Sequence, residues 1–272
     1  MQRLAFTALL RRGRERGDMK PQASSERTPT FLVGCAGWSL PSRDTAGFGE
    51  GASALQRYAT RFGLVEINSS FYRPHKPETY ARWAQSVPEG FRFSVKMPQA
   101  ISHEYGLKGA GSLLEPFLQG AEQLGDRLGA LLLQLPPRLA YDGRTASAFF
   151  RALRRRTAVP VACEPRHDSW FTDRADAMMV KHDIARVAAD PARCPQAATP
   201  GGARHWSYWR WHGRPRMYYS SYAEDELRGL AAKAGQAAQH GPAWVILDNT
   251  AHGHAVPNAL RLQALLAENA DA

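Results

Sequence analysis

The sequence predicts an α/β fold of the TIM-barrel-like (β/α)8 class. After residue 30, apolar and amphipathic segments alternate along the chain, and eight apolar segments recur at roughly the 30-residue spacing of a βαβ unit. The apolar segments are nearly continuous, as in parallel strands that are buried on both faces. Eight such units in about 240 residues also match the usual size of this barrel.

The expected strands are short apolar runs that end in polar residues. In order, they are residues 31–38, 64–71, 91–98, 130–137, 159–165, 184–190, 206–213 and 243–250. Seven of them are followed by apolar residues with the i, i+3, i+4 spacing of an amphipathic helix. Ser53 is a helix cap for the first of these helices, and Pro77 is a good first-turn residue for the second. The apolar faces of the seven helices cover residues 55–62, 80–87, 114–121, 146–153, 175–182, 227–234 and 256–260.

The sixth unit is expected to lack its helix. The segment after Asp190 reads PARCPQAATPGGARH, with three prolines and two adjacent glycines that do not sustain a helix interior. We therefore expect an irregular crossing from Asp190 to Trp206. An open doubly wound sheet is the alternative fold, but GCAGWS after the first strand is not a GxGxxG fingerprint, and no P-loop occurs.

Two regions are expected: a disordered basic extension at residues 1–29 and a single TIM-barrel-like domain at residues 30–272. The extension holds seven Arg or Lys against three acids, and most of the charge follows its short apolar run, unlike an export signal. Met19 is an alternative start. Three cysteines without a CxxC pair argue against a disulfide framework and a zinc ribbon. No apolar run has the length of a membrane span, and we expect a cytoplasmic protein with no membrane partner.

Polar side chains stand at the carboxyl ends of the strands, which face the mouth of such a barrel. Burying acids and a lysine there is costly unless they are paired, so we expect a shared site. The candidates for catalysis are Glu66, Lys96, Glu164 and His212. The candidates for substrate binding are Trp38, Asn68, Tyr72, Gln134, Arg166, His167, Trp170, Asp190, Arg210, Asp248 and Asn249. The alternative is an internal layer of salt bridges, with Lys96 between Glu66 and Glu164.

Seven motifs in order carry a resemblance to a known family: VGCAGWS, VEINSSFY, FRFSVKMP, LLLQLPP, CEPRHDSWF, RWHGR and LDNTAHGHAVPNALRL. Over about residues 31–266, the chain resembles the YecE-like family, also called domain of unknown function 72. The resemblance implies a TIM-barrel-like fold and no established activity. Its motif positions carry over to Glu66, Asn68, Phe71, Tyr72, Lys96, Pro98, Gln134, Glu164, Arg166, His167, Ser169, Trp170, Arg210, His212 and Asn249. The family often has two asparagines in its last strand, and here Asp248 replaces the first of them.

The first functional hypothesis is an enzyme of hydrolase, lyase or isomerase type that acts on an anionic or sugar-like small molecule. Arg166 and Arg210 can clamp an anion. Glu164 or Glu66 can act as general base, and His212 or His167 as acid. Lys96 can polarise a carbonyl or form a Schiff base. The sequence identifies no cofactor.

Two further hypotheses stay open. A metal-assisted hydrolase or isomerase would use carboxylates and a histidine, although Lys96 and the two arginines would repel a cation. Its candidate ligands are Glu66, Glu164, Asp190, His212 and Asp248. A nucleic-acid-binding module is suggested by the net charge of +10, by the run Arg154–Arg156 and by tryptophans that could stack on bases. These tryptophans are Trp206, Trp209 and Trp211.

Overall fold

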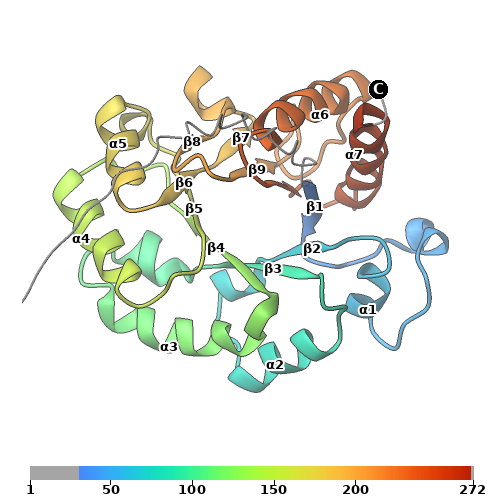
Figure 1. Cartoon of the computed structure of the whole chain (residues 1–272), viewed down its shortest axis with the longest axis horizontal. Helices are drawn as coiled ribbons and strands as arrows, with labels where there is room; N and C mark the ends of the chain where they lie inside the picture. Colours follow the sequence, from blue (N-terminus) through green and yellow to red (C-terminus); the bar gives the residue numbers. More distant parts are fainter. Residues whose placement is uncertain (1–30, 271–272) are drawn as a thin grey trace, which may run out of the picture.

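The computed structural model describes residues 31–270, and its strands form one curved sheet encircled by helices (Figure 1). The strands are β1 (Phe31–Ala36), β2 (Leu64–Ile67), β3 (Arg92–Lys96), β4 (Leu128–Gln134), β5 (Val161–Glu164), β6 (Ile184–Arg186), β7 (Ala188–Asp190), β8 (Gly201–Gly202), β9 (Ser207–Trp211) and β10 (Ala243–Leu247). They pair in the order β7-β9-β10-β1-β2-β3-β4-β5-β6-β8, and each pair except β6–β8 is parallel. The TIM-barrel-like α/β fold is therefore confirmed.

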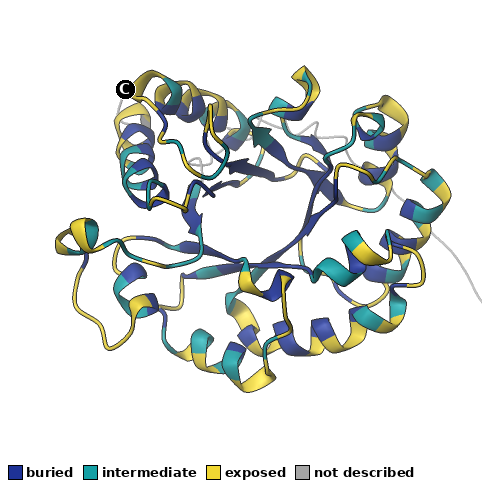
Figure 2. Ribbon diagram, turned by 180° about the vertical axis from the view of Figure 1, so that it is seen from behind, coloured by how far each residue is buried: buried dark blue, intermediate teal, exposed yellow. Residues whose placement is uncertain are grey.

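Within residues 31–270, seven α-helices surround the sheet, as the apolar periodicity predicted. They are α1 (Ala54–Tyr58), α2 (Pro77–Gln85), α3 (Gly111–Ala121), α4 (Gly143–Arg154), α5 (Asp173–Lys181), α6 (Glu224–Ala238) and α7 (Ala255–Ala270). Buried residues lie along the strands and on the helix sides that face them, and exposed residues lie outside (Figure 2). The Ser53 hydroxyl caps α1 by accepting a hydrogen bond from the backbone N–H of Gln56.

The barrel closes through its sixth strand, which is divided at Val187. The first part, β6, pairs with β5, and the second part, β7, pairs with β9. Val187 continues the first pairing, because its N–H donates to the Cys163 carbonyl at 2.9 Å. One continuous strand therefore joins the two ends of the sheet.

The expected irregular crossing after Asp190 is confirmed. Residues 191–205 contain one 3-10 turn, Pro195–Ala198, and the two-residue strand β8. Arg186 anchors the turn, because its Nη1 donates to the Gln196 carbonyl at 2.7 Å. The guanidinium also pairs with Asp176 of α5 at 3.1 Å.

Side chains inside the barrel form an apolar layer below the strand ends. Alternate residues of a strand face the same side of a sheet. Leu64, Leu132, Ala162, Tyr208 and Ile246 belong to one buried cluster. Two residues further along each of these strands stand Glu66, Gln134, Glu164, Arg210 and Asp248. The alternation therefore places polar side chains directly above an apolar floor.

Two sequence-based expectations concern other parts of the chain. The expected extension, residues 1–29, lies outside the residues described. Between residues 31 and 270, no helix is both long enough and apolar enough to cross a bilayer.

Candidate functional site

Arg210 lies at the centre of a buried group of ionisable side chains. We call this group the strand-end cluster: Glu66, Glu164, Arg210, His212 and Asp248. Each member is at most 4% exposed. The members come from the ends of four strands, β2, β5, β9 and β10, or from the residue just beyond a strand end. The structure thus brings together three of the four predicted catalytic residues and two of the predicted binding residues.

The Arg210 guanidinium binds all three carboxylates of the cluster. Its Nε and Nη2 donate to the two oxygens of Glu66 at 3.0 and 2.8 Å. Its Nη2 also donates to Asp248 Oδ2 at 2.9 Å, and its Nη1 donates to Glu164 Oε2. Tyr208 below adds a hydrogen bond to Glu66 Oε2 at 3.1 Å. Both Glu66 oxygens are therefore engaged, and Glu66 orients Arg210.

His212 is held between two carboxylates. Its Nδ1 lies 2.9 Å from Asp248 Oδ2, and its Nε2 lies 3.2 Å from Glu164 Oε1. Burial opposes a charged imidazole, but Glu164 and Asp248 outweigh it and raise the pKa of His212. The same pairing, with Arg210 foremost, overcomes burial and holds the pKa of Glu164 well below its usual range. Both ring nitrogens of His212 contact carboxylates, so the ring fixes the positions of Glu164 and Asp248.

Replacing Asp248 by asparagine is expected to lower the pKa of His212. The amide keeps a polar group beside Nδ1 but removes one of the two negative charges that favour the imidazolium. A histidine whose pKa is raised by folding adds stability at low pH and loses it as pH rises through the folded pKa. The variant should therefore lose this contribution at lower pH than the wild type. NMR titration of the His212 ring measures the change, with the exposed substitution Glu224→Gln as control. An unchanged His212 pKa would contradict the expectation.

Lys96 stands beside the strand-end cluster without joining its ion pairs. It is 5% exposed, and its Nζ lies 4.2 Å from the centre of the Phe71 ring. Among residues 31–269, no side chain or carbonyl forms a hydrogen bond or ion pair with Nζ. Burial, reinforced by Arg210, lowers the pKa of Lys96 to about 8, although nearby carboxylates oppose the shift. Arg210, not Lys96, occupies the place between Glu66 and Glu164.

Arg166 and Tyr218 form the outer edge of the cluster. Arg166 Nε donates to Glu164 Oε1 at 2.8 Å, and its terminal nitrogens lie 3.3 and 3.4 Å from the Tyr218 hydroxyl. Tyr218 has a φ of 71°, a strained backbone conformation for a bulky residue. Gly213 permits the loop to fold back, because a Cβ there would lie 2.7 Å from the Ser220 carbonyl oxygen. Tyr218 could not be predicted from the sequence, since no periodic signal marks this loop.

A family model described as "Protein of unknown function DUF72" matches residues 32–272. The chain belongs to the DUF72 family. Solved structures of this family show the same fold. A DUF72 family protein from Enterococcus faecalis V583 matches with a TM-score of 0.76 and 23% identity, covering 88% of this chain and 96% of that one. Another from Thermotoga maritima MSB8 matches with a TM-score of 0.72 and 24% identity, covering 88% of this chain and 99% of that one.

Curated relatives agree with the DUF72 assignment and carry no named activity. The UPF0759 protein YecE of Escherichia coli (strain K12) is 36% identical over 106 residues, which are 39% of this chain. The chain spans only 38% of YecE in that match. The UPF0759 protein YunF of Bacillus subtilis (strain 168) is 24% identical over 272 residues, covering 87% of this chain and 94% of YunF. The YecE-like resemblance read from the motifs is thus confirmed.

Several predicted binding residues of this DUF72 chain make other contacts. Asn249 donates to the Ser220 carbonyl and to Asn258, and so fixes the loop that carries Tyr218. Trp170 is buried and donates to the Leu139 carbonyl. Asp190 accepts a hydrogen bond from Tyr222 at 2.8 Å. These contacts hold loops around the mouth.

The remaining candidates lie at the edges of the mouth or beyond it. Trp38 packs edge-on against Trp83 of α2. His167 accepts a hydrogen bond from the Ser169 N–H. Tyr72 is 70% exposed, and Gln134 is buried. Asn68 Oδ1 is buried and has no hydrogen-bond partner in the described part of the chain.

The cluster does not resemble a metal-binding arrangement. The Arg210 guanidinium occupies the space between the three carboxylates, where a cation would have to sit. Asp190, another suggested ligand, lies with Tyr222 and Arg214 instead. Within the described part of the chain, no group of three or more His, Cys, Asp or Glu side chains is arranged to hold a metal ion.

The tryptophans that suggested base stacking are buried. Trp206, Trp209 and Trp211 are 6%, 2% and 7% exposed. Trp209 and Trp211 pack in the cluster between sheet and helices, and Trp206 packs with Tyr208 and Trp244 inside the barrel. As placed, they offer no face to a nucleic acid base.

Proposed function

We propose that this DUF72 protein is a cytoplasmic enzyme that acts on a small anionic molecule by general acid–base chemistry at the barrel mouth, with Lys96 as the proton-transferring group. The proposal rests mainly on one observation: the Lys96 ammonium is buried beside a charged cluster, against the Phe71 ring, and has no hydrogen-bond or ion-pair partner among residues 31–269. A buried charge without a partner is costly. Such costs are typical of functional sites, where stability is traded for reactivity.

The strand-end cluster has a positioning role in this proposal. Glu66 orients Arg210, and Glu164 and Asp248 hold the His212 ring between them and favour its charged form. Two charged groups at this place, Lys96 Nζ and Asp248 Oδ1, have no hydrogen-bond partner among the described residues. Between them they offer a donor and an acceptor, which is the minimum for moving a proton onto and off a substrate.

Arg166 supplies the contact for the anionic group of the substrate. Its guanidinium uses Nε on Glu164, and its terminal nitrogens make only long contacts of 3.3 and 3.4 Å to Tyr218. Those two nitrogens have the spacing that binds a carboxylate or phosphate bidentately. The net charge of +10 also favours encounter with anions.

Lys96 is expected to react with an amine-specific reagent along a pH profile centred near 8, where its pKa lies. Competitive labelling with acetic anhydride, read by peptide mass spectrometry, measures this profile. Exposed Lys233 on α6 is the internal reference within each sample. Inorganic phosphate should protect Lys96 from labelling in the wild type, and the protection should be lost in Arg166→Met. A Lys96 profile identical to that of Lys233, or labelling indifferent to phosphate, would contradict the proposal.

A turnover assay distinguishes whether this protein is an enzyme or only binds small molecules. Phosphorylated sugars and small carboxylates are incubated with wild-type protein and with Lys96→Met, and the products are followed by NMR. Conversion by the wild type alone supports acid–base catalysis through Lys96. Equal conversion by both proteins would remove Lys96 from the mechanism.

A further inference from the structure

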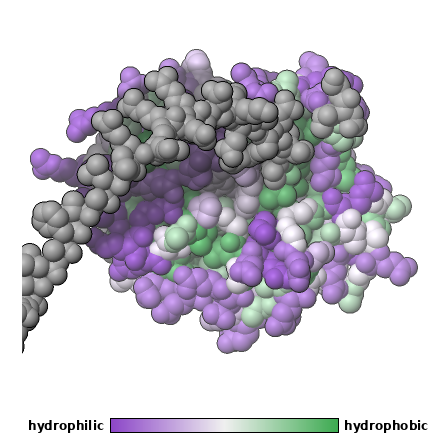
Figure 3. Space-filling model, viewed as in Figure 1, coloured by the Kyte–Doolittle hydropathy of each residue, from purple (hydrophilic) through white to green (hydrophobic). Residues whose placement is uncertain are grey.

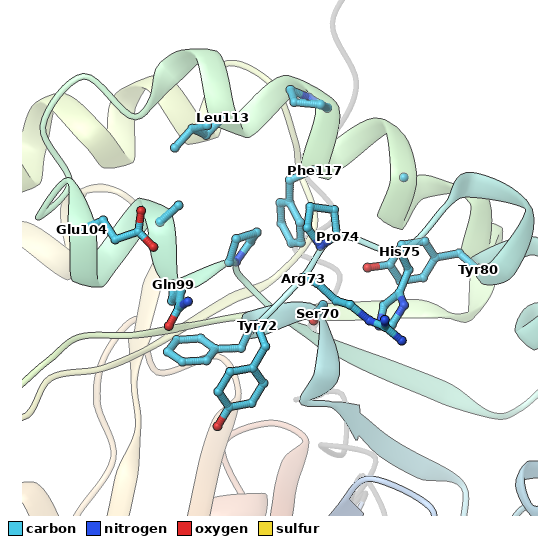
Figure 4. Close-up of a pocket in the computed structure, with 15 residues that line it drawn as sticks. Ser70, Tyr72, Arg73, Pro74, His75, Tyr80, Gln99, Glu104, Leu113 and Phe117 are labelled. Atoms are coloured by element: carbon cyan, nitrogen blue, oxygen red, sulfur yellow. The ribbon is translucent and has the colours of Figure 1, made fainter.

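A cavity lies outside the barrel, between the segment after β2 and helix α3 (Figure 4). Its volume is about 210 Å³. The inner walls are mainly apolar, and they are formed by Phe71, Pro74, Tyr80, Pro98, Leu113 and Phe117. An apolar cavity of about 150 Å³ is enough to bind benzene. The volume and lining therefore suit a single six-membered aromatic ring with a short substituent.

Helix α3 keeps this cavity open with residues that disfavour a helix. Leu113, Pro116, Phe117 and Gly120 line the cavity at i, i+3, i+4 and i+7, so they share one face of the helix. Pro116 lacks the N–H that would bond one turn back, and Gly120 is a poor helix former. A Cβ at Gly120 would already touch the Tyr80 ring at 3.4 Å. A larger side chain there would fill the cavity.

The two ends of the cavity carry opposite charges. Arg73 and His75 lie on one side, and Glu104 lies on the other (Figure 4). Burial, and then Arg73, lowers the pKa of His75, whose Nε2 is 2.8 Å from the Ser69 hydroxyl. This shift favours the neutral form of His75, and Arg73 provides the positive charge on that side. Neither Arg73 nor Glu104 forms an ion pair with another of the described residues.

On the face shown in Figure 3, polar residues occupy most of the periphery, and hydrophobic residues gather toward the middle. A concave apolar surface with one unpaired guanidinium at its end combines features of a small-molecule site. The ring gains from burial, and the guanidinium gains from an anion.

We propose that the cavity between residues 70–75 and α3 binds a small aromatic carboxylate, with its ring against Phe71 and Phe117 and its carboxylate on Arg73. Phe71 also connects this cavity to the barrel mouth, because the Lys96 ammonium lies against the same ring. The proposal stands on different residues from those of the proposed catalytic site. Either can fail without the other.

Titration with 3-phenylpropionate, followed by saturation-transfer NMR, tests the proposal on the full chain. Saturable binding to the wild type is expected. Arg73→Ala should weaken it about tenfold, the effect of losing one charge-assisted hydrogen bond. Arg82→Ala is the matched control. Arg82 is also an exposed arginine, but it lies on α2 and does not line the cavity, so its loss should leave the affinity unchanged. The alcohol 3-phenyl-1-propanol should bind the wild type about as weakly as 3-phenylpropionate binds Arg73→Ala, and propionate should not bind.

Variants that fill the cavity test whether 3-phenylpropionate binds there. Gly120→Leu should abolish binding of 3-phenylpropionate, and Leu113→Trp, which fills the cavity from another position, should do the same if Gly120→Leu fails to fold. The fold of each variant is checked by its melting transition. Absence of saturable binding to the wild type, equal losses in Arg73→Ala and Arg82→Ala, or binding that survives in a folded filled variant would each overturn the proposal.

Discussion

Replacing Arg210 by methionine is expected to lower the free energy of unfolding by about 3–5 kcal/mol, the usual cost of breaking a buried ion pair by removing one partner. The substitution leaves the carboxylates of Glu66, Glu164 and Asp248 together in a layer that is at most 4% exposed. Urea unfolding at pH 7 measures the loss. Arg210→Lys keeps the charge but not the bidentate geometry, so it should fall between methionine and the wild type.

Arg228→Met is the matched control for this experiment. Arg228 is exposed on α6 and pairs with Glu224 one turn away. Surface pairs of this kind contribute little to stability. If Arg210→Met and Arg228→Met unfold at the same urea concentration as the wild type, the strand-end cluster does not hold the barrel together.

Replacing Lys96 by methionine is expected to have the opposite effect and to stabilise the protein by about 3 kcal/mol at pH 7. This size follows from the fall of the Lys96 pKa from 10.5 to about 8 on folding, at about 1.4 kcal/mol per pKa unit. The wild type must keep a charged ammonium in a buried place where none of the described residues forms an ion pair with it. Methionine fills similar space beside Phe71 without a charge.

The gain should depend on pH in a defined direction. Between about pH 8 and 10.5, unfolded Lys96 binds its proton while folded Lys96 has released it, so the wild type becomes more stable as pH rises. The advantage of Lys96→Met is therefore complete below pH 8 and shrinks above it. Unfolding curves of the two proteins at several pH values measure this difference. A destabilised Lys96→Met at pH 7 would show that the ammonium is paired in solution.

Much of the fold could be predicted from the sequence, because each strand and helix carries its own periodic signal. The division of the sixth strand at Val187 could not, since it depends on which neighbours the strand meets in space. The shared position of Glu66, Glu164 and His212 within their units predicted that they would lie together, and in the structure all three belong to the strand-end cluster. Strand alternation then fixed which side chains face inward.

Which side chains pair with one another in the site could not be predicted from the sequence. Either Lys96 or Arg210 could have stood between Glu66 and Glu164. The structure has Arg210 there, and Glu66 is in register with Ser94, two residues before Lys96. Trp170 and Asp190 follow strands as the other candidates do, yet their side chains turn to Leu139 and Tyr222. Tyr218 reaches Arg166 from 52 positions away along the chain, through a loop whose course no local pattern records.

The divided sixth strand also limits how the chain can change in length. One residue, Val187, separates a segment in register with β5 from a segment in register with β9. An insertion at that point would leave Ile184–Arg186 in place and shift Ala188–Asp190 against β9, turning every side chain of the second segment to the other face. The irregular crossing that follows, from Pro191 to His205, has no such double constraint. Insertions and deletions among relatives should therefore be tolerated in the crossing and avoided in the strand just before it.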